Sequence, residues 1–156
     1  MALNWSLTTF DDLTPAQLYD ILRLRIDVFM LEQNVPFSET DGKDAGALHL
    51  TGYDGTALAC YTRIFPPGHK YDGHICAAAR IGRVVTCKNY RGKGLGHVLI
   101  KEAIRTIEEK CGATAITLNG QEHLQDFYAA HGFVTEGDIF IEDDIPHVKM
   151  TRKAAS

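Results

Sequence analysis

The sequence lacks the features that several large classes of protein require. It has no basic excess, because 16 Lys and Arg stand against 20 Asp and Glu, for a formal net charge of −4; nucleic-acid-binding domains normally carry such an excess. It has no run of about 18 apolar residues, and its start has no basic segment leading into an apolar stretch. We therefore expect a cytoplasmic chain that binds neither nucleic acid nor membrane.

Metal-binding motifs are also missing. The four cysteines, Cys60, Cys76, Cys87 and Cys111, form no Cys-x-x-Cys pair, and the seven histidines include no His-Glu-x-x-His spacing. Each cysteine lies in or beside an apolar run, where it behaves as a small hydrophobe. We expect inert thiols, no disulfide framework and no metal site.

The length and hydrophobic content suit one compact domain. The 156 residues, 45% of them hydrophobic, are expected to form a single domain over 1–156. Thr14, Pro15 and Gln17 are typical of a helix start with a capping box, and Asp54-Gly55 predicts a hairpin turn. The periodicity predicts helices over 14–33, 94–110 and 121–131 and strands over 4–10, 48–53, 57–65, 75–86, 113–118, 133–141 and 147–150.

A basic, glycine-rich loop is the most informative segment. It follows the apolar run that ends in Val84-Val85-Thr86 and leads into the helix expected over 94–110. Glycine lets the backbone approach a ligand closely, and a helix N-terminus offers free N–H groups. We expect the loop to hold a pyrophosphate with the residues Arg91, Gly92, Lys93, Gly94, Leu95 and Gly96.

Two common phosphate-binding motifs fit this loop poorly. A P-loop needs Gly-Lys followed by Ser or Thr, whereas Gly94 follows Gly92-Lys93 here. A dinucleotide site needs Gly-x-Gly-x-x-Gly and an acidic residue after the next strand, where this chain has Leu118-Asn119-Gly120. A plain glycine-rich turn with solvated basic residues is the structural alternative.

The loop has a closer counterpart in an enzyme family. Arg91 to Gly96 resembles the Gln/Arg-x-x-Gly-x-Gly/Ala signature of the GNAT N-acetyltransferase superfamily. The resemblance implies that acetyl-CoA is the cosubstrate and that the loop holds its pyrophosphate. It also implies that free backbone groups of Val84, Val85 and Thr86 pair with the pantetheine, as an added strand would.

A second segment resembles the same superfamily. Phe127-Tyr128, followed by Gly132-Phe133, matches its Phe-Tyr-x-x-x-Gly-Phe pattern. In that family the tyrosine protonates the departing CoA thiolate, so the resemblance makes Tyr128 the general acid; a core aromatic with a hydrogen-bonded hydroxyl is the alternative. Gln121 stands where many members carry a cofactor-contacting Asn, and we count it as a cofactor contact.

The resemblance extends from Trp5 to Met150 and is closest to the ElaA-like subgroup. The residues that carry it include Leu24-Arg25, Val28-Phe29, Glu32-Gln33, Pro36, Asp41, Asp44, His49 and the segments 81–84 and 142–147. It implies a GNAT-like α/β fold: a mixed, mostly antiparallel sheet flanked by helices, with a splayed parallel pair formed by 81–86 and 113–118.

The general base is open. An acceptor ammonium must lose a proton before it attacks a thioester, yet the strand before the loop carries Arg80 and Arg83 and no acid. Glu32 and His49 are our base candidates, although Glu32 could close a helix-end network and His49 could be a satisfied core histidine. The remaining candidates are Glu142, Asp143 and His147, and the segment Glu142 to Asp144 could be a solvated turn.

We therefore expect an N-acetyltransferase that moves an acetyl group from acetyl-CoA to the primary amine of a small molecule or peptide. A non-catalytic CoA-binding module of the same fold and an acyltransferase with a longer acyl donor are the alternatives. The loop over 38–46 and the cluster over 142–144 are acidic and would favour a cationic acceptor if they border its cleft. An exposed edge strand would allow a homodimer.

Overall fold

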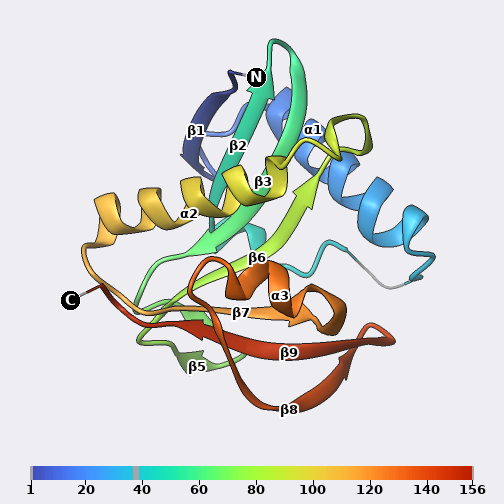
Figure 1. Cartoon of the computed structure of the whole chain (residues 1–156). Helices are drawn as coiled ribbons and strands as arrows, with labels where there is room; N and C mark the ends of the chain where they lie inside the picture. Colours follow the sequence, from blue (N-terminus) through green and yellow to red (C-terminus); the bar gives the residue numbers. More distant parts are fainter. Residues whose placement is uncertain (1, 37–38, 156) are drawn as a thin grey trace. The chain divides into compact units, whose positions relative to one another are not determined.

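The chain folds into nine strands, three α-helices and several short helical turns in a computed structural model that describes residues 2–36 and 39–155 (Figure 1). In chain order the elements are β1 (Asn4–Thr9), α1 (Pro15–Arg25), the π-helical η1 (Ile26–Glu32), the 3₁₀ turn η2 (Asp44–Gly46), β2 (Leu48–Asp54), β3 (Ala57–Phe65), β4 (Lys70–Tyr71), β5 (His74–Ile75), β6 (Ala79–Thr86), the 3₁₀ turn η3 (Lys88–Tyr90), α2 (Leu95–Cys111), β7 (Ile116–Gln121), the 3₁₀ turn η4 (Glu122–Leu124), α3 (Gln125–Ala129), β8 (Val134–Glu142) and β9 (Ile145–Arg152). Seven strands form one sheet in the order β1-β2-β3-β6-β7-β9-β8. Its pairs are antiparallel except β6–β7, which is parallel, among the pairs whose register is resolved. The expected mixed α/β fold is confirmed.

The chain divides into two compact units. The N-terminal unit comprises Met1–Ile64 and Arg83–Leu99, and the C-terminal unit comprises Phe65–Gly82 and Ile100–Ser156. Each unit is described by itself below. The expectation that 1–156 act as a single domain stays a prediction.

In the N-terminal unit, α1 starts with the predicted capping box. Gln17 N donates to Thr14 Oγ1 at 3.1 Å, and Thr14 N donates to Gln17 Oε1 at 2.9 Å. The reciprocal bonds satisfy backbone donors that a helix start leaves open. After Arg25 the helix widens into η1, and π-helical turns are frequent at functional sites.

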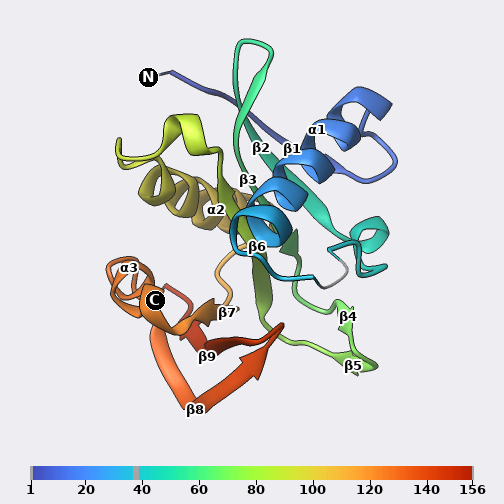
Figure 2. The same cartoon turned by 90° about the vertical axis from the view of Figure 1, so that its right-hand side faces the viewer.

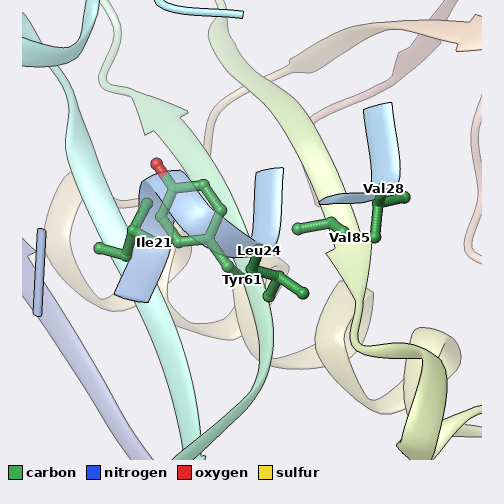
Figure 3. Close-up of a cluster of buried hydrophobic side chains, with 5 residues drawn as sticks. All are labelled: Ile21, Leu24, Val28, Tyr61 and Val85. Carbon is green, nitrogen blue, oxygen red and sulfur yellow. The ribbon is translucent and has the colours of Figure 1, made fainter. Parts of the chain in front are cut away.

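A hydrophobic cluster holds this helix to the sheet. Ile21, Leu24 and Val28 project from α1 and η1 at helical spacing and meet Tyr61 of β3 and Val85 of β6 (Figure 3). All five side chains are buried. Removal of such apolar area from water is the main stabilising term of a fold, so β6 reaches the glycine loop from a fixed position in this unit.

In the C-terminal unit, β7, β9 and β8 lie side by side (Figure 2). β9 pairs antiparallel with both neighbours, with Gln121 opposite His147 on one side and Phe140 opposite His147 on the other. Parallel pairs join Ala79 to Ile116 and Arg80 to Thr117, the first two residues of β6 and β7. Pairing confined to the strand starts is what a splayed parallel pair requires.

The sequence predicted a single strand over 75–86, and this prediction is wrong. β4 and β5 make a separate hairpin, and β6 begins only at Ala79. The turn residues Asp72 and Gly73 have φ values of 49° and 83°, and two positive φ values in succession are those of a tight two-residue hairpin turn. This turn takes Ile75 out of the central strand and leaves it exposed.

The helix expected over 121–131 is also shorter than predicted. Gln121 is the last residue of β7, η4 follows, and α3 covers only Gln125–Ala129. The pairing of Gln121 with His147 carries the strand through this residue. Inter-strand pairing therefore overrides the helical periodicity of the segment, as tertiary context commonly does.

Candidate functional site

The glycine loop lies between β6 and α2, in the strand–loop–helix order that a phosphate site needs. Gly92 and Gly94 have φ values of 80° and 74°, which side-chain-bearing residues rarely adopt. A Cβ added at either position would meet no atom within 4 Å. The glycines are therefore needed for their backbone shape, and the space beside them can admit a ligand.

The start of α2 supplies donors toward this space. Val98 N donates to Gly94 O at 3.3 Å, so the helical hydrogen bonds begin at Gly94. The N–H groups of the first helical turn, which includes Leu95 and Gly96, have no intrahelical acceptor. Together with Lys93, they make a positively polarised surface that suits a pyrophosphate.

Arg91 is held by protein groups on two sides. Its Nε and Nη2 donate to the Thr86 carbonyl oxygen at 3.3 and 3.2 Å. Its Nη1 and Nη2 donate to the two carboxylate oxygens of Glu32, the second at 2.9 Å. Arg91 thereby ties the end of β6 to η1. The Thr86 carbonyl, which we expected to be open to pantetheine, already has a partner.

This pairing bears on Glu32 as a candidate base. The hydrogen bond from Arg91 lowers the pKa of Glu32, and a carboxylate with a lowered pKa is a weaker proton acceptor. The geometry favours the alternative reading, in which Glu32 closes a network at the end of the helix. Its role as a base stays a prediction.

His49 is fully buried, with both ring nitrogens engaged. Nε2 lies 2.9 Å from the Asp44 carbonyl oxygen, which can only accept, so Nε2 carries the proton. Nδ1 then accepts from the Tyr61 hydroxyl at 2.7 Å. Burial lowers the pKa of His49. The geometry matches a satisfied core histidine, and the base role of His49 likewise stays a prediction.

A set of six charged side chains, the ion cluster, lies beside this histidine, whose Nε2 meets the Asp44 backbone. Its members are Arg25, Glu39, Asp41, Asp44, Arg63 and Arg83. Arg25 bridges Glu39 at 3.0 Å and Asp44 at 2.7 Å. Arg63 holds both carboxylate oxygens of Asp41 at 2.8 Å. The sequence analysis did not find this cluster, although Arg25 falls on the apolar stripe of α1, which is an unusual place for a charge.

The cluster changes what the acidic loop over 38–46 can do. Ser38 lies outside the described residues, and the carboxylates of Glu39, Asp41 and Asp44 are paired with arginines. Burial is the largest influence on Asp41 and raises its pKa, but the hydrogen bonds from Arg63 and from the Lys43 backbone, together with the charges of Arg63 and Arg83, outweigh burial and hold that pKa below its usual range. Three cations neutralise three anions here, so the loop offers little attraction to a cationic acceptor.

Tyr128 lies in the C-terminal unit with its ring against the backbone of β7. A Cβ added at Gly120 would lie 3.1 Å from Cδ2 and Cε2 of Tyr128, so a larger residue would push the ring a few tenths of an ångström away from the strand. Phe127 and Phe133 pack edge-on against the ring. Tyr128 is 6% exposed, and burial raises its pKa above the usual range. Among residues 2–36 and 39–155 we find no hydrogen-bond partner for its hydroxyl.

The N-terminal unit also has a groove of about 760 Å³ beside the glycine loop. It was not anticipated from the sequence. Cys87, Lys88 and Asn89 line it directly after β6, and Glu32 lines it from η1. Its other lining residues are Asp20, Arg23, Leu24, Asp27, Val28, Leu31, Thr56, Ala57 and Leu58.

Comparison with known proteins identifies the family. A family model described as an acetyltransferase (GNAT) domain matches residues 44–154. The chain belongs to the GNAT acetyltransferase family. Protein ElaA of Escherichia coli K12 is 31% identical over 153 residues, which cover 97% of each chain. The resemblance to the GNAT superfamily and its ElaA-like subgroup is confirmed.

Solved structures of GNAT-family relatives agree in fold. The crystal structure of an acyl-CoA N-acyltransferase from Pseudomonas aeruginosa has a TM-score of 0.87 and 37% identity, over 97% of this chain and 99% of that one. The crystal structure of E. coli ElaA also has a TM-score of 0.87, with 32% identity over 97% of this chain and 100% of that one.

Two further observations concern membrane and metal. None of the helices in the described ranges is long and apolar enough to cross a membrane. Within those ranges, no group of three or more His, Cys, Asp and Glu side chains could hold a metal ion. The cytoplasmic location, the lack of a metal and of a nucleic-acid partner, and the homodimer stay predictions.

Proposed function

We propose that this GNAT-family protein transfers an acetyl group from acetyl-CoA to a primary amine of a small molecule or peptide. The observation that carries the proposal is Tyr128, a largely buried phenol whose hydroxyl has no partner in the described part of the chain and is not fully closed off from solvent. Buried polar groups in folded proteins are nearly always hydrogen-bonded. A hydroxyl that is not is therefore a candidate for contact with a ligand.

The cofactor loop would bind the CoA pyrophosphate, which is the same in acetyl-CoA and in the CoA product. Backbone N–H groups of Gly94, Leu95 and Gly96 and the Lys93 ammonium would face the pyrophosphate. The room beside Gly92 and Gly94 supports this fit. Arg91 would act by fixing the loop, because Glu32 and Thr86 already hold its guanidinium. Val84, Val85 and the Gln121 side chain would meet the pantetheine.

Tyr128 would donate its proton to the departing sulfur. A thioester supplies an activated acyl carbon and a thiolate as leaving group. Burial keeps Tyr128 protonated at neutral pH. The same loss of water would raise the proton affinity of a thiolate beside it, because desolvation disfavours every charged form. A neutral phenol can therefore serve as the acid even though its own pKa is raised.

Thiol release tests the proposal. We would supply acetyl-, propionyl- and succinyl-CoA with a library of amines and identify products by mass spectrometry. Amine-dependent release, fastest with acetyl-CoA, is expected. Tight acetyl-CoA binding without turnover would identify a binding module instead. Faster release from a longer donor would keep the N-acyltransferase and overturn the acetyl assignment.

A further inference from the structure

His147 of β9 has a geometry that the function proposed above does not yet use. Its strand β9 runs between β7 and β8 (Figure 2). His147 is opposite Gln121 at the end of β7 and opposite Phe140 of β8. Residues directly opposite one another in a sheet share one face. Phe140 stacks on the imidazole with ring centroids 6.0 Å apart and planes at 25°. The ring is thereby held beside the Gln121 side chain.

The hydrogen bonds of His147 fix its tautomer. Nδ1 lies 2.7 Å from the Ile145 carbonyl oxygen, which can only accept, so Nδ1 carries the proton. Nε2 therefore has its lone pair in place. It lies 3.6 Å from Oε2 of Glu142, but two acceptors cannot hydrogen-bond. A proton that arrives on Nε2 would turn this contact into an ion pair.

Tyr128 and His147 lie on opposite faces of β7. The Cβ direction of Gly120 meets the Tyr128 ring, and the next residue, Gln121, projects to the other face. His147 shares that face with Gln121. A phenol that touched the imidazole would hydrogen-bond to it, as Tyr61 does to His49, and neither group would be open to a substrate. Separated by the strand, one can serve the leaving group while the other serves the nucleophile.

We propose that His147 Nε2 takes the proton of the acceptor ammonium and that Glu142 stabilises the imidazolium. This inference rests on the proposed N-acyltransferase function. It replaces Glu32 and His49, whose polar atoms are already engaged, with a side chain whose basic nitrogen has no donor facing it in the described ranges.

The protons balance in the following way. The ammonium gives one proton to Nε2 and becomes a free amine. Its lone pair forms the C–N bond at the thioester carbonyl carbon, and the C–S bond breaks. The thiolate takes a proton from Tyr128, and the second nitrogen proton, lost as the amide forms, restores the phenol. His147 returns its proton to solvent, so amide, CoA thiol and one free proton result.

Other charged residues lie on the segments next to His147. The β8–β9 turn adds Asp143 and Asp144, and Lys149, two residues along β9, is paired with Glu136 at 3.7 Å. Glu122 and His123 of η4 follow Gln121. Acidic groups predominate around the β8–β9 turn, which favours a cationic acceptor.

His147→Asn is the direct test, because the Asn amide can still donate to the Ile145 carbonyl. With acetyl-CoA and the best amine, we expect kcat/KM for the amine at neutral pH to fall by roughly 10² to 10⁴-fold. The KM for acetyl-CoA should stay unchanged. The deficit should shrink at a pH where the amine is already neutral, which a merely structural defect would not reproduce.

Glu142→Gln tests the same step at an exposed position. Without the carboxylate the imidazolium is less stable, so the acid limb of the kcat/KM profile should move to lower pH and the rate should fall less than in His147→Asn. Glu136→Gln, on the same strand but paired with Lys149, is the matched control and should leave the profile in place. In the wild type, ¹⁵N NMR should find the His147 proton on Nδ1.

The outcomes separate the two proposals. If the wild type acylates no amine, the proposed function fails and this inference fails with it. If the wild type is active while folded His147→Asn keeps its rate and pH profile, only the role of His147 is overturned. Should His147→Asn not fold, an unmoved acid limb in Glu142→Gln overturns it, as would a proton on Nε2 in the NMR spectrum.

Discussion

Two buried tyrosines, one in each unit, have opposite surroundings. Tyr61 is fully buried, its hydroxyl donates to His49 Nδ1 at 2.7 Å, and the Arg25 guanidinium lies 5.9 Å from its ring centre. Tyr128 is nearly as buried, but its ring contacts are apolar or aromatic and its hydroxyl has no partner in the described ranges. Burial raises the pKa of both. The two tyrosines therefore differ in the hydrogen bonding of the hydroxyl and not in the direction of the pKa shift. A structural tyrosine has a partner for its hydroxyl, and a tyrosine suited to chemistry has none.

The largest effect should come from the charges around Tyr61. Arg25→Met leaves the carboxylates of Glu39 and Asp44 with one cation each, Arg83 and Arg63. We expect the free energy of unfolding, measured in urea, to fall by about 3 kcal/mol, the lower end for a broken buried ion pair, because each carboxylate keeps one partner. The control Arg105→Met removes an exposed arginine of α2. It should change the free energy of unfolding by less than about 0.5 kcal/mol. A similar small change in both variants would contradict a structural role for the cluster.

The second-largest effect should be a loss of kcat when Tyr128 is changed. Tyr128→Phe removes a hydroxyl without leaving a protein partner unsatisfied, so the free energy of unfolding should change by less than about 0.5 kcal/mol. We expect kcat to fall by roughly 10²-fold, the lower end for a general acid, since a thiolate is already a fair leaving group. Steady-state kinetics with single-turnover controls would measure it. Full kcat across the pH range, with chemistry rate-limiting, would show that another group or water supplies the proton.

Tyr61→Phe should reverse that pattern. It leaves His49 Nδ1 buried without a donor, which should cost about 1–3 kcal/mol of unfolding free energy. In the folded protein kcat should remain close to that of the wild type. A loss of kcat as large as that of Tyr128→Phe, at a temperature where both are folded, would break the comparison between the two tyrosines.

The smallest effect should come from the exposed pair beside the loop. Glu32→Gln weakens the hold on Arg91, so KM for acetyl-CoA should rise by up to roughly 10-fold with kcat kept, the signature of a binding defect. Arg91→Ala should do the same. Glu109→Gln, in an exposed pair with Arg105, serves as control. A fall of kcat in Glu32→Gln with unchanged KM would instead restore Glu32 as a base.

Local signals in the sequence predicted most of the fold. The capping box at Thr14 and the glycine that ends α2 depend on neighbouring residues, and the structure contains both. The hairpin predicted from Asp54-Gly55 is also present, but Asp54 pairs with Ala57, so its two turn residues are Gly55 and Thr56. The errors at 75–86 and 121–131 came from pairing between distant segments. Apolar periodicity alone cannot reveal that β4 pairs with β5 or that Gln121 pairs with His147.

The candidate site divides along the same line. The glycine loop and the Phe-Tyr segment are contiguous in sequence, so their residue types and spacing could be recognised. The partners of Arg91, His49 and His147 come from other elements of the fold. Whether a histidine nitrogen is free to take a proton depends on those partners, and only the three-dimensional arrangement supplies them.

Arg83 links the acidic loop to the strand that leads into the cofactor loop. Its φ of 50° is rare for a residue with a side chain, and its Nε donates to Glu39 at 2.6 Å while Nη2 reaches Asp41. The backbone shape of β6 is thus secured by residues more than forty positions earlier in the chain. The segment 39–46 and Arg83 consequently depend on each other. A chimera that takes this segment from a distant relative must also take the residue that the relative has in place of Arg83.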